Sequence, residues 1–123
     1  MPEFSAYSPG TPSWVDHGAK DITASNSFYT GLFDWKPETM SLGDVQYTVF
    51  HTNRPNAGMM AWQQSPPYWL LYLQVESCDQ TAKQASALGG KVLAPPADIP
   101  NVGRYAVLQD PQGVHFGILE PLK

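Results

Sequence analysis

Charged residues are scarce in this sequence. They make up 15 % of its 123 residues, and seven basic residues against eleven acidic ones leave a net charge of −4. Disordered chains combine low hydrophobicity with high charge, so a chain with 42 % hydrophobic residues is predicted to fold. Surfaces that bind nucleic acid or anionic membranes need clustered basic residues. The composition therefore argues against nucleic acid and against a membrane as partners.

Cysteine and long apolar runs are almost absent as well. Cys78 is the only cysteine, which excludes an intrachain disulfide and is typical of a reducing compartment. No segment approaches the roughly 18 apolar residues of a membrane span. The first residues have neither the basic start nor the apolar run of a signal peptide. We therefore expect a cytoplasmic protein.

Proline and glycine, with 12 and 10 residues, are abundant instead. They predict many turns, and hence short strands rather than a helical bundle. Residues 1–13 are expected to form an extended arm and 95–102 a proline-bearing loop. Alternating segments rich in β-branched and aromatic residues predict strands at 14–18, 35–40, 45–52, 57–62, 68–75, 91–94, 103–109 and 114–120, with turns at 42–44, 53–56 and 110–113.

Two helices are predicted between these strands. Apolar residues recur at helical spacing from position 22 to 33, and Asp21 precedes them as a capping residue. This pattern predicts an amphipathic helix of about three turns. Ser77 and Gln80 form a capping box for a second helix, which Gly89 and Gly90 would end.

Two strings of the first half recur in the second. YTVF at 47–50 resembles YAVL at 105–108, and each precedes a turn and then a glycine with two apolar residues, GMM at 58–60 and GIL at 117–119. This repeat implies two βαβββ modules, about 14–63 and about 68–121, each too small to bury its own core. We therefore expect them to pack side by side in a single domain, 14–123.

The segments WVDHGAKD, SFYTGLFDWK, AGMMAW, LGGKVLAPPADIPNVGRYAVLQDPQG and FGILEP resemble the vicinal-oxygen-chelate superfamily, which includes glyoxalase I, bleomycin-resistance proteins and extradiol dioxygenases. The chain is most similar to its bacterial glyoxalase-like branch. The resemblance implies an α+β fold, in which two βαβββ modules form a curved, partly open eight-stranded mixed sheet with helices on the outer face. It also implies a homodimer and a ligand on the concave face of the sheet.

Alternation along the strands assigns side chains to two faces. Nine side chains are predicted to lie on the helix-packed face: Val15, His17, Trp69, Leu71, Leu73, Val75, Val114, Phe116 and Ile118. The predicted ligand-binding residues are Trp14, Asp16, Phe50, Met60, Trp62, Leu70, Tyr72, Gln74, Arg104 and His115. Such a wall is typical of a pocket for a small aromatic or apolar molecule. The alternative is that these aromatic residues fill a closed core.

Metal-dependent members of the superfamily bind a divalent cation through His, Gln or Glu at four inward positions. The resemblance places these positions at Trp14, Gly58, Leu70 (Trp69 if the register is shifted by one) and Gly117. None of these side chains can donate a lone pair to a metal. The sequence therefore predicts that the usual metal site is missing, and it indicates no cofactor.

Few residues suggest catalysis without a metal. Asp16 and His115 are candidates for an acid–base pair. The alternative is that Asp16 is a solvated or hydrogen-bonded residue at the rim of the pocket. His17 and His51 are interpreted as structural or surface residues. Cys78 is interpreted either as a thiol activated by a helix N-terminus or as a small core residue.

The first functional hypothesis is a homodimeric protein that binds a small aromatic or apolar ligand. The alternatives are a lyase, isomerase or dioxygenase of the same superfamily, such as a glyoxalase-like lyase, and an assembly subunit with a vestigial pocket.

Overall fold

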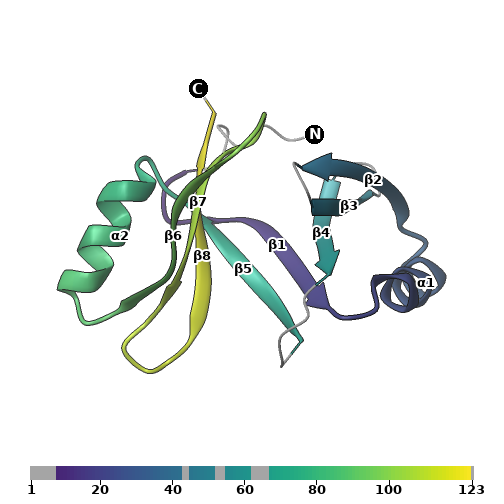
Figure 1. The fold of residues 1–123 in the computed structure, drawn as a ribbon, viewed down its shortest axis with the longest axis horizontal. Helices are drawn as coiled ribbons and strands as arrows, with labels where there is room; N and C mark the ends of the chain where they lie inside the picture. The colour runs from purple at the N-terminus through teal and green to yellow at the C-terminus, as the bar shows by residue number, and fades with distance from the viewer. Residues whose placement is uncertain (1–7, 43–44, 52–54, 62–66, 123) are drawn as a thin grey trace. The chain divides into compact units, whose positions relative to one another are not determined.

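The computed structural model of the protein describes residues 8–42, 45–51, 55–61 and 67–122. Within these residues the chain forms eight strands and two helices in the order βαβββ, twice (Figure 1). The elements are β1 (Pro12–Ala19), α1 (Ile22–Phe33), β2 (Lys36–Leu42), β3 (Val45–His51), β4 (Pro55–Ala61), β5 (Tyr68–Gln74), α2 (Cys78–Ala87), β6 (Lys91–Ile99), β7 (Gly103–Gln109) and β8 (His115–Pro121). The α+β fold class and the two βαβββ modules are confirmed.

The chain forms two compact units. Unit one is Trp14–Leu70, and unit two comprises residues 71–122 together with 8–13. Gly10 N–H donates to the carbonyl oxygen of Gln74 at 2.8 Å, and Gln74 N–H donates to that of Thr11 at 2.8 Å. The last part of the predicted arm is therefore held against β5. Residues 1–7, 43–44, 52–54 and 62–66, which include parts of the predicted arm, turns and strands, lie outside the described residues.

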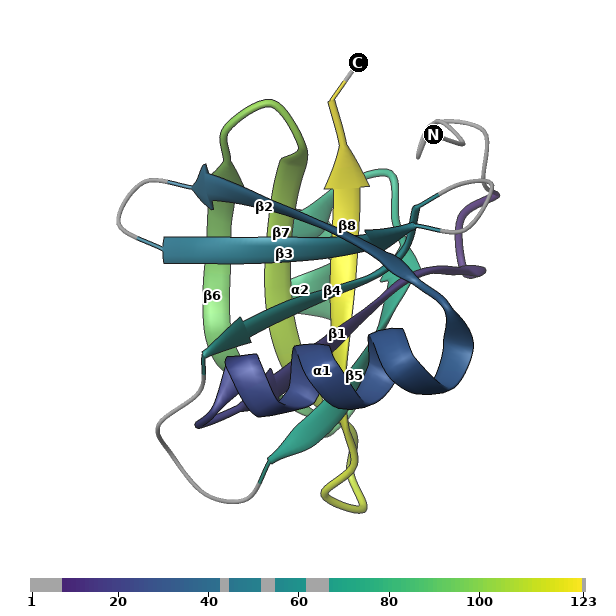
Figure 2. The same ribbon diagram turned by 90° about the vertical axis from the view of Figure 1, so that its right-hand side faces the viewer.

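In unit one the strand order is β2-β3-β4-β1. Strands β2, β3 and β4 are antiparallel neighbours, and β1 pairs with β4 in parallel (Figure 2). The register aligns Asp16 with Gly58 and Val49 with the same glycine. These pairs bring the middle of β1 and the middle of β3 to either side of Gly58.

Helix α1 begins where the sequence predicts. Asp21 accepts a hydrogen bond from Ala24 N–H at 3.0 Å, and the helix ends at Asp34, whose φ of 59° is left-handed. The apolar face of α1 is less buried than the pattern predicts, because no residue of α1 is buried and Phe28, Leu32 and Phe33 are exposed. The amphipathic pattern placed the helix correctly and overestimated its burial.

Aromatic rings connect α1 to the sheet of unit one. Tyr29 contacts His17, Trp69 and Trp35 at centroid distances of 5.5, 5.5 and 5.8 Å, and Trp35 contacts Phe50 at 5.2 Å. His17 and Trp69 therefore lie on the helix side, as predicted, but Trp69 remains 46 % exposed rather than buried. Phe50 is 1 % exposed within this helix-side cluster, which corrects its assignment to the ligand-binding face.

His17 is expected to make the stability of the protein depend on pH. Its ring is 8 % exposed, burial lowers the pKa below 6.5, and Nδ1 has no hydrogen-bond partner among the described residues. The unfolded state therefore binds a proton at higher pH than the folded state. We expect the free energy of unfolding to fall as pH drops below about 6.5 towards the folded-state pKa, and to be retained above it.

Urea denaturation at about pH 7.5 and about pH 5.5 tests this dependence. His17→Phe keeps a ring and removes the titration, so its unfolding free energy should change less between the two pH values. An equal change in both proteins would assign the dependence to other groups.

In unit two the strand order is β5-β8-β7-β6, with β5 and β8 parallel and the other neighbours antiparallel. Its core joins the buried side of α2 to the sheet through Cys78, Ala82, Ala106, Leu108 and Ile118. Val75 and Phe116 pack against this cluster. The helix-side assignment of Phe116 and Ile118 is confirmed, whereas Val114 and Leu71 are exposed.

Cys78 is fully buried in this core. Burial, assisted by the charges of Glu120 and Asp79, raises the pKa of its thiol to about 11. The interpretation as a core residue is confirmed, and that as an activated thiol is wrong, because desolvation disfavours the thiolate more than the helix terminus favours it.

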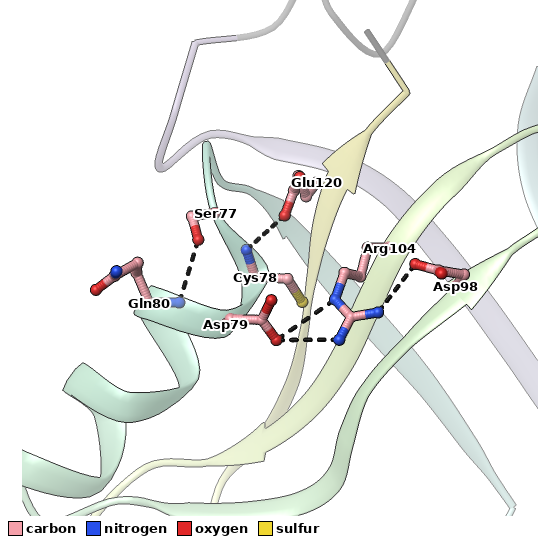
Figure 3. A network of polar contacts seen from close by, with 7 residues as sticks. All are labelled: Ser77, Cys78, Asp79, Gln80, Asp98, Arg104 and Glu120. Carbon is pink, nitrogen blue, oxygen red and sulfur yellow. Dashed lines mark hydrogen bonds and ion pairs between the residues drawn. The ribbon is translucent and has the colours of Figure 1, made fainter.

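The N-terminus of α2 is fixed by three side chains (Figure 3). Ser77 Oγ accepts from Gln80 N–H at 3.2 Å, as the capping box predicts, and Glu120 Oε1 accepts from Cys78 N–H at 2.8 Å. Arg104 bridges Asp79 on α2 and Asp98 on β6 at 3.1 and 2.9 Å. Arg104 therefore shares the helix-side face with Ala106 and Leu108, which corrects its assignment to the ligand-binding face.

Strand β6 is longer than predicted. It continues through Pro95 and Pro96 to Ile99, where a loop was expected. Its pairing with β7 shifts register between Val92 and Ala94 and again before Ala97. Pro95 and Pro96 are tolerated because they lie in the second register shift, where neither is paired with β7, and because β6 has no neighbour on its other side. No helix among the described residues is long and apolar enough to cross a membrane.

Candidate ligand-binding site

The inner face of unit one, opposite α1, is organised around Gly58. A Cβ built on Gly58 would overlap the hydroxyl and ring of Tyr47, so the ring of this β3 residue lies across β4. Neighbouring strands are about 4.8 Å apart, and a tyrosine can span the distance from β3 to β1 only if no side chain on β4 blocks it. Glycine at position 58 therefore lets Tyr47 reach β1.

On β1, Tyr47 meets two residues that the sequence assigns to the ligand-binding face. Trp14 Nε1 donates to the Tyr47 hydroxyl at 2.7 Å and to Asp16 Oδ1 at 3.0 Å. The Tyr47 hydroxyl also donates to Asp16 Oδ1. We call these three residues the Trp14–Asp16–Tyr47 cluster. Asp16 is only 8 % exposed, and its Oδ1 accepts both of these hydrogen bonds.

The inner face of unit two repeats this plan with a different ring. Gly117 aligns with Tyr72 of β5 and with Val107 of β7, just as Gly58 aligns with Asp16 and Val49. A Cβ on Gly117 would overlap the Tyr72 ring. In unit one the ring beside Gly58 is that of Tyr47, from the antiparallel neighbour β3. In unit two the ring beside Gly117 is that of Tyr72, from the parallel neighbour β5.

Strand β5 alternates as the sequence predicts. Leu70, Tyr72 and Gln74 are buried, while Trp69 and Leu71 on the other face are exposed. Gln74 is 4 % exposed, and its Oε1 has no hydrogen-bond partner in the described part of the chain. A buried amide of this kind is a polar group that a ligand or water can satisfy.

The structure brings together only some of the predicted site residues. Trp14 and Asp16 are joined, and Tyr47, which the sequence analysis missed, completes their cluster. His115 is exposed and its Nε2 lies 3.1 Å from Gln109 Oε1; its pairing with Asp16 stays a prediction. Trp62 lies outside the described residues, and the side chain of Met60 is not described. His51 pairs with Glu38 at 3.0 Å, as a surface residue would.

The four positions that the resemblance assigns to metal ligands hold no side-chain donor atom in this chain. The Trp14 indole nitrogen can only donate, and it donates to Asp16 and Tyr47. Gly58 and Gly117 supply no donor atom, and tyrosine rings occupy the space beside both. Within the described residues no three His, Cys, Asp or Glu side chains gather closely enough to hold a metal. Of the four inward positions, none offers a metal-binding atom.

Comparison with known proteins identifies the family. Residues 12–118 match the glyoxalase/bleomycin resistance protein/dioxygenase superfamily. The chain belongs to this superfamily. Its superfamily relatives include the anthracycline biosynthesis protein DnrV of Streptomyces peucetius, 32 % identical over 94 % of this chain and 48 % of that protein. The putative glyoxylase CFP32 of Mycobacterium tuberculosis is 55 % identical over 46 % of this chain and 22 % of that protein. The chain thus spans about half the length of DnrV.

Solved structures of the superfamily share the fold. Methylmalonyl-CoA epimerase from Mycobacterium tuberculosis superimposes with a TM-score of 0.69 at 14 % identity, covering 96 % of this chain and 93 % of that one. The hypothetical protein BH1468 from Bacillus halodurans gives 0.70 at 14 % identity, covering 93 % and 96 %. At this identity the likeness concerns the backbone, so the chemistry must be argued from the side chains.

Proposed function

We propose that this chain binds a small planar aromatic molecule on its inner face, against the Trp14–Asp16–Tyr47 cluster, without a metal ion. The observation that carries the proposal is this cluster itself. It joins two aromatic side chains and one carboxylate in a hydrogen-bonded group, and it includes Trp14, one of the four positions that the resemblance assigns to metal ligands.

The chemistry of the cluster favours a ligand with both an aromatic plane and polar edge groups. Stacking of a ligand on an aromatic side chain such as Trp14 or Tyr47 is worth about 0.5–1.5 kcal/mol per well-placed pair. The Asp16 carboxylate accepts hydrogen bonds, so a phenolic or amine donor suits it better than an anion. The relative DnrV is named for anthracycline biosynthesis, and anthracyclines are planar polycyclic compounds with phenolic groups.

The test uses 1,4-dihydroxyanthraquinone as the probe and its own fluorescence as the readout. Trp14→Ala is expected to weaken binding by about 1 kcal/mol or more, roughly fivefold in Kd, because a stacking partner is lost. Asp16→Asn should also weaken binding, because the amide is a poorer acceptor than the carboxylate. EDTA should leave the affinity unchanged.

Trp69→Phe is the control, because Trp69 lies on the helix side against Tyr29 and His17. Its Kd should equal that of the unsubstituted protein. If the Trp14→Ala variant bound the probe as tightly as the unsubstituted protein, the proposed site would be refuted. A loss of binding after EDTA treatment would refute its independence from metal.

A further inference from the structure

Gln74, on β5, has a buried side-chain oxygen without a hydrogen-bond partner. The residue is 4 % exposed, and its Oε1 makes no hydrogen bond within the described part of the chain. Its backbone is engaged elsewhere, because its N–H donates to the carbonyl oxygen of Thr11 and its carbonyl oxygen accepts from Gly10 N–H, both at 2.8 Å. A buried polar atom that stays unpartnered lowers the stability of a fold. The amide of Gln74 is therefore unfavourable unless another molecule pairs with it.

Gln74 differs in position from the other described residues with such an atom, which are Ser13, His17 and Asn26. Asn26 lies in α1, and Ser13 and His17 alternate to the helix side of β1. Gln74 alternates to the same side of β5 as Tyr72, whose ring lies beside Gly117 on the inner face of unit two. Of these four residues, Gln74 is the one on the inner face of a sheet.

The repeat indicates that the fold itself does not need an amide at this position. Gly18 is the counterpart of Gln74 in unit one, since each lies two residues after the position that aligns with the repeated glycine, Gly58 or Gly117. A Cβ built on Gly18 would overlap the ring of Tyr68, so unit one fills this place with an aromatic ring. Unit two places a polar side chain there instead, which favours a role for Gln74 other than packing.

The side chains around Gln74 on the inner face are uncharged. Its row across the sheet, from β5 to β6, consists of Gln74, Leu119, Tyr105 and Ala97, and the next row consists of Tyr72, Gly117, Val107 and Ala94. The charged residues that lie nearest along these strands alternate to the helix side, namely Asp98, Arg104 and Glu120.

The charged and titratable residues of the inner face of unit two lie further away. His115 and Lys91 align with Gln109 in a separate row, about 13 Å along the strands from the row of Gln74. A charged ligand beside Gln74 would therefore lose its water without gaining a counter-charge. The surroundings favour a neutral ligand.

The row of Gln74 becomes more exposed from β5 towards β6. Gln74 and Leu119 are each 4 % exposed, Tyr105 is half-buried and Ala97 is exposed. A small molecule can therefore approach over the exposed end of the row. Because neighbouring strands are about 4.8 Å apart, the Cα atoms of Gln74 and Tyr105 are separated by about 10 Å. One small ring lying over Leu119 spans this distance.

We propose that Gln74 binds a neutral cyclic amide, a lactam, on the inner face of unit two. A glutamine amide carries an acceptor oxygen beside two N–H donors. A lactam carries an N–H beside a carbonyl oxygen, so it can donate to Gln74 Oε1 and accept from Nε2 at the same time. Its apolar ring then packs on Leu119 and beside Tyr105. This site does not depend on the Trp14–Asp16–Tyr47 cluster, which belongs to unit one.

The probe for this site is δ-valerolactam, and its N-methyl derivative, which has lost the N–H, is the matched control compound. NMR titration of isotopically labelled protein up to about 50 mM, a range suited to so small a ligand, follows the side-chain NH2 resonances of Gln74. δ-Valerolactam should shift these resonances and bind about tenfold more tightly than the N-methyl compound, because the latter leaves Oε1 unpaired. Equal affinities, or Gln74 resonances that do not move, would overturn the proposal.

Gln74→Met tests the residue itself, since methionine keeps the length of the side chain and removes both polar groups. The Kd for δ-valerolactam should rise about tenfold or more. The urea midpoint should stay the same or rise, because an unpartnered polar atom is no longer buried. A lower midpoint would show that the fold or a bound water satisfies Oε1, and it would refute the proposal.

Gln46→Met is the matched control variant. Gln46 is exposed on β3 and its amide donates to Ser41 Oγ at 3.1 Å, so this variant should bind δ-valerolactam as tightly as the unsubstituted protein. An equal loss of affinity in the Gln46 and Gln74 variants would assign the effect to the substitution type and not to the site. If Gln74→Met does not fold, the comparison of the two lactams on the unsubstituted protein still decides.

Discussion

Alanine in place of Gly58 is expected to lower the free energy of unfolding by about 2–4 kcal/mol, since overpacking costs about 1–3 kcal/mol and buried hydrogen bonds are lost in addition. The added Cβ would overlap the ring and hydroxyl of Tyr47. Tyr47 must then move, and its contacts with Trp14 and Asp16 break. Urea denaturation followed by circular dichroism measures the loss.

The same substitution made in a Tyr47→Ala background separates this cause from a general effect of losing glycine. With the ring removed, the new Cβ has room, so Gly58→Ala should cost much less there than in the unsubstituted protein. A double-mutant cycle gives the coupling between the two positions. Equal costs in both backgrounds would show that Tyr47 does not lie over Gly58.

Truncation of Leu108 is expected to destabilise the protein by about 2–5 kcal/mol, the range for a fully buried leucine whose cavity collapses only in part. Leu108 is 0 % exposed and lies among Cys78, Ala82, Ala106 and Ile118. Its loss leaves the side of α2 that faces the sheet without one of its largest fully buried partners. Chemical denaturation of Leu108→Ala compared with the unsubstituted protein provides the value.

Leu88→Ala is the matched control for Leu108→Ala, because Leu88 is 72 % exposed and should change stability by less than about 0.5 kcal/mol. The loss of stability caused by Trp69→Ala should lie between those of Leu88→Ala and Leu108→Ala. The sequence suggests a fully buried tryptophan, but with 46 % exposure we expect a cost of about 1–2 kcal/mol, in proportion to the area it buries. A cost for Leu108→Ala as small as that for Leu88→Ala would contradict the core described for unit two.

The sequence predicted the elements well where local chemistry determines them. Asp21 and Ser77 cap α1 and α2 as expected, because their side-chain oxygens accept from nearby backbone N–H groups. The repeat of YTVF and GMM was also informative. It is reflected in the equal registers of Val49 with Gly58 and Val107 with Gly117.

Contacts between distant residues were predicted less well. The ring of Tyr47 crosses a whole strand, which depends on the register of three strands and on the absence of a side chain at Gly58. Alternation does place Tyr47 on the inner face, and Gly58, on the strand between Tyr47 and Asp16, was the signal that could have revealed the cluster. Phe50 and Arg104 have the opposite parity to Val49 and Val107, which align with the two glycines of the inner face, so residue type alone does not predict their side of the sheet.

Sequence periodicity also does not predict how deeply a side chain is buried. A helical pattern gives the direction in which apolar side chains point, but not whether anything lies there. Phe28 and Leu32 follow the predicted helical spacing, yet both side chains stay largely exposed.

The prolines of the outermost strands restrict how copies of this protein can associate. Strands β2 and β6 stand last in the strand order, and they contain Pro37 and the pair Pro95–Pro96. An incoming strand needs a row of N–H groups, and proline at an edge interrupts that row. β6 is further distorted by its two register shifts. Growth of the sheet from molecule to molecule, the route to cross-β aggregates, is thereby obstructed at both ends, which leaves side-chain surfaces rather than open strands for assembly.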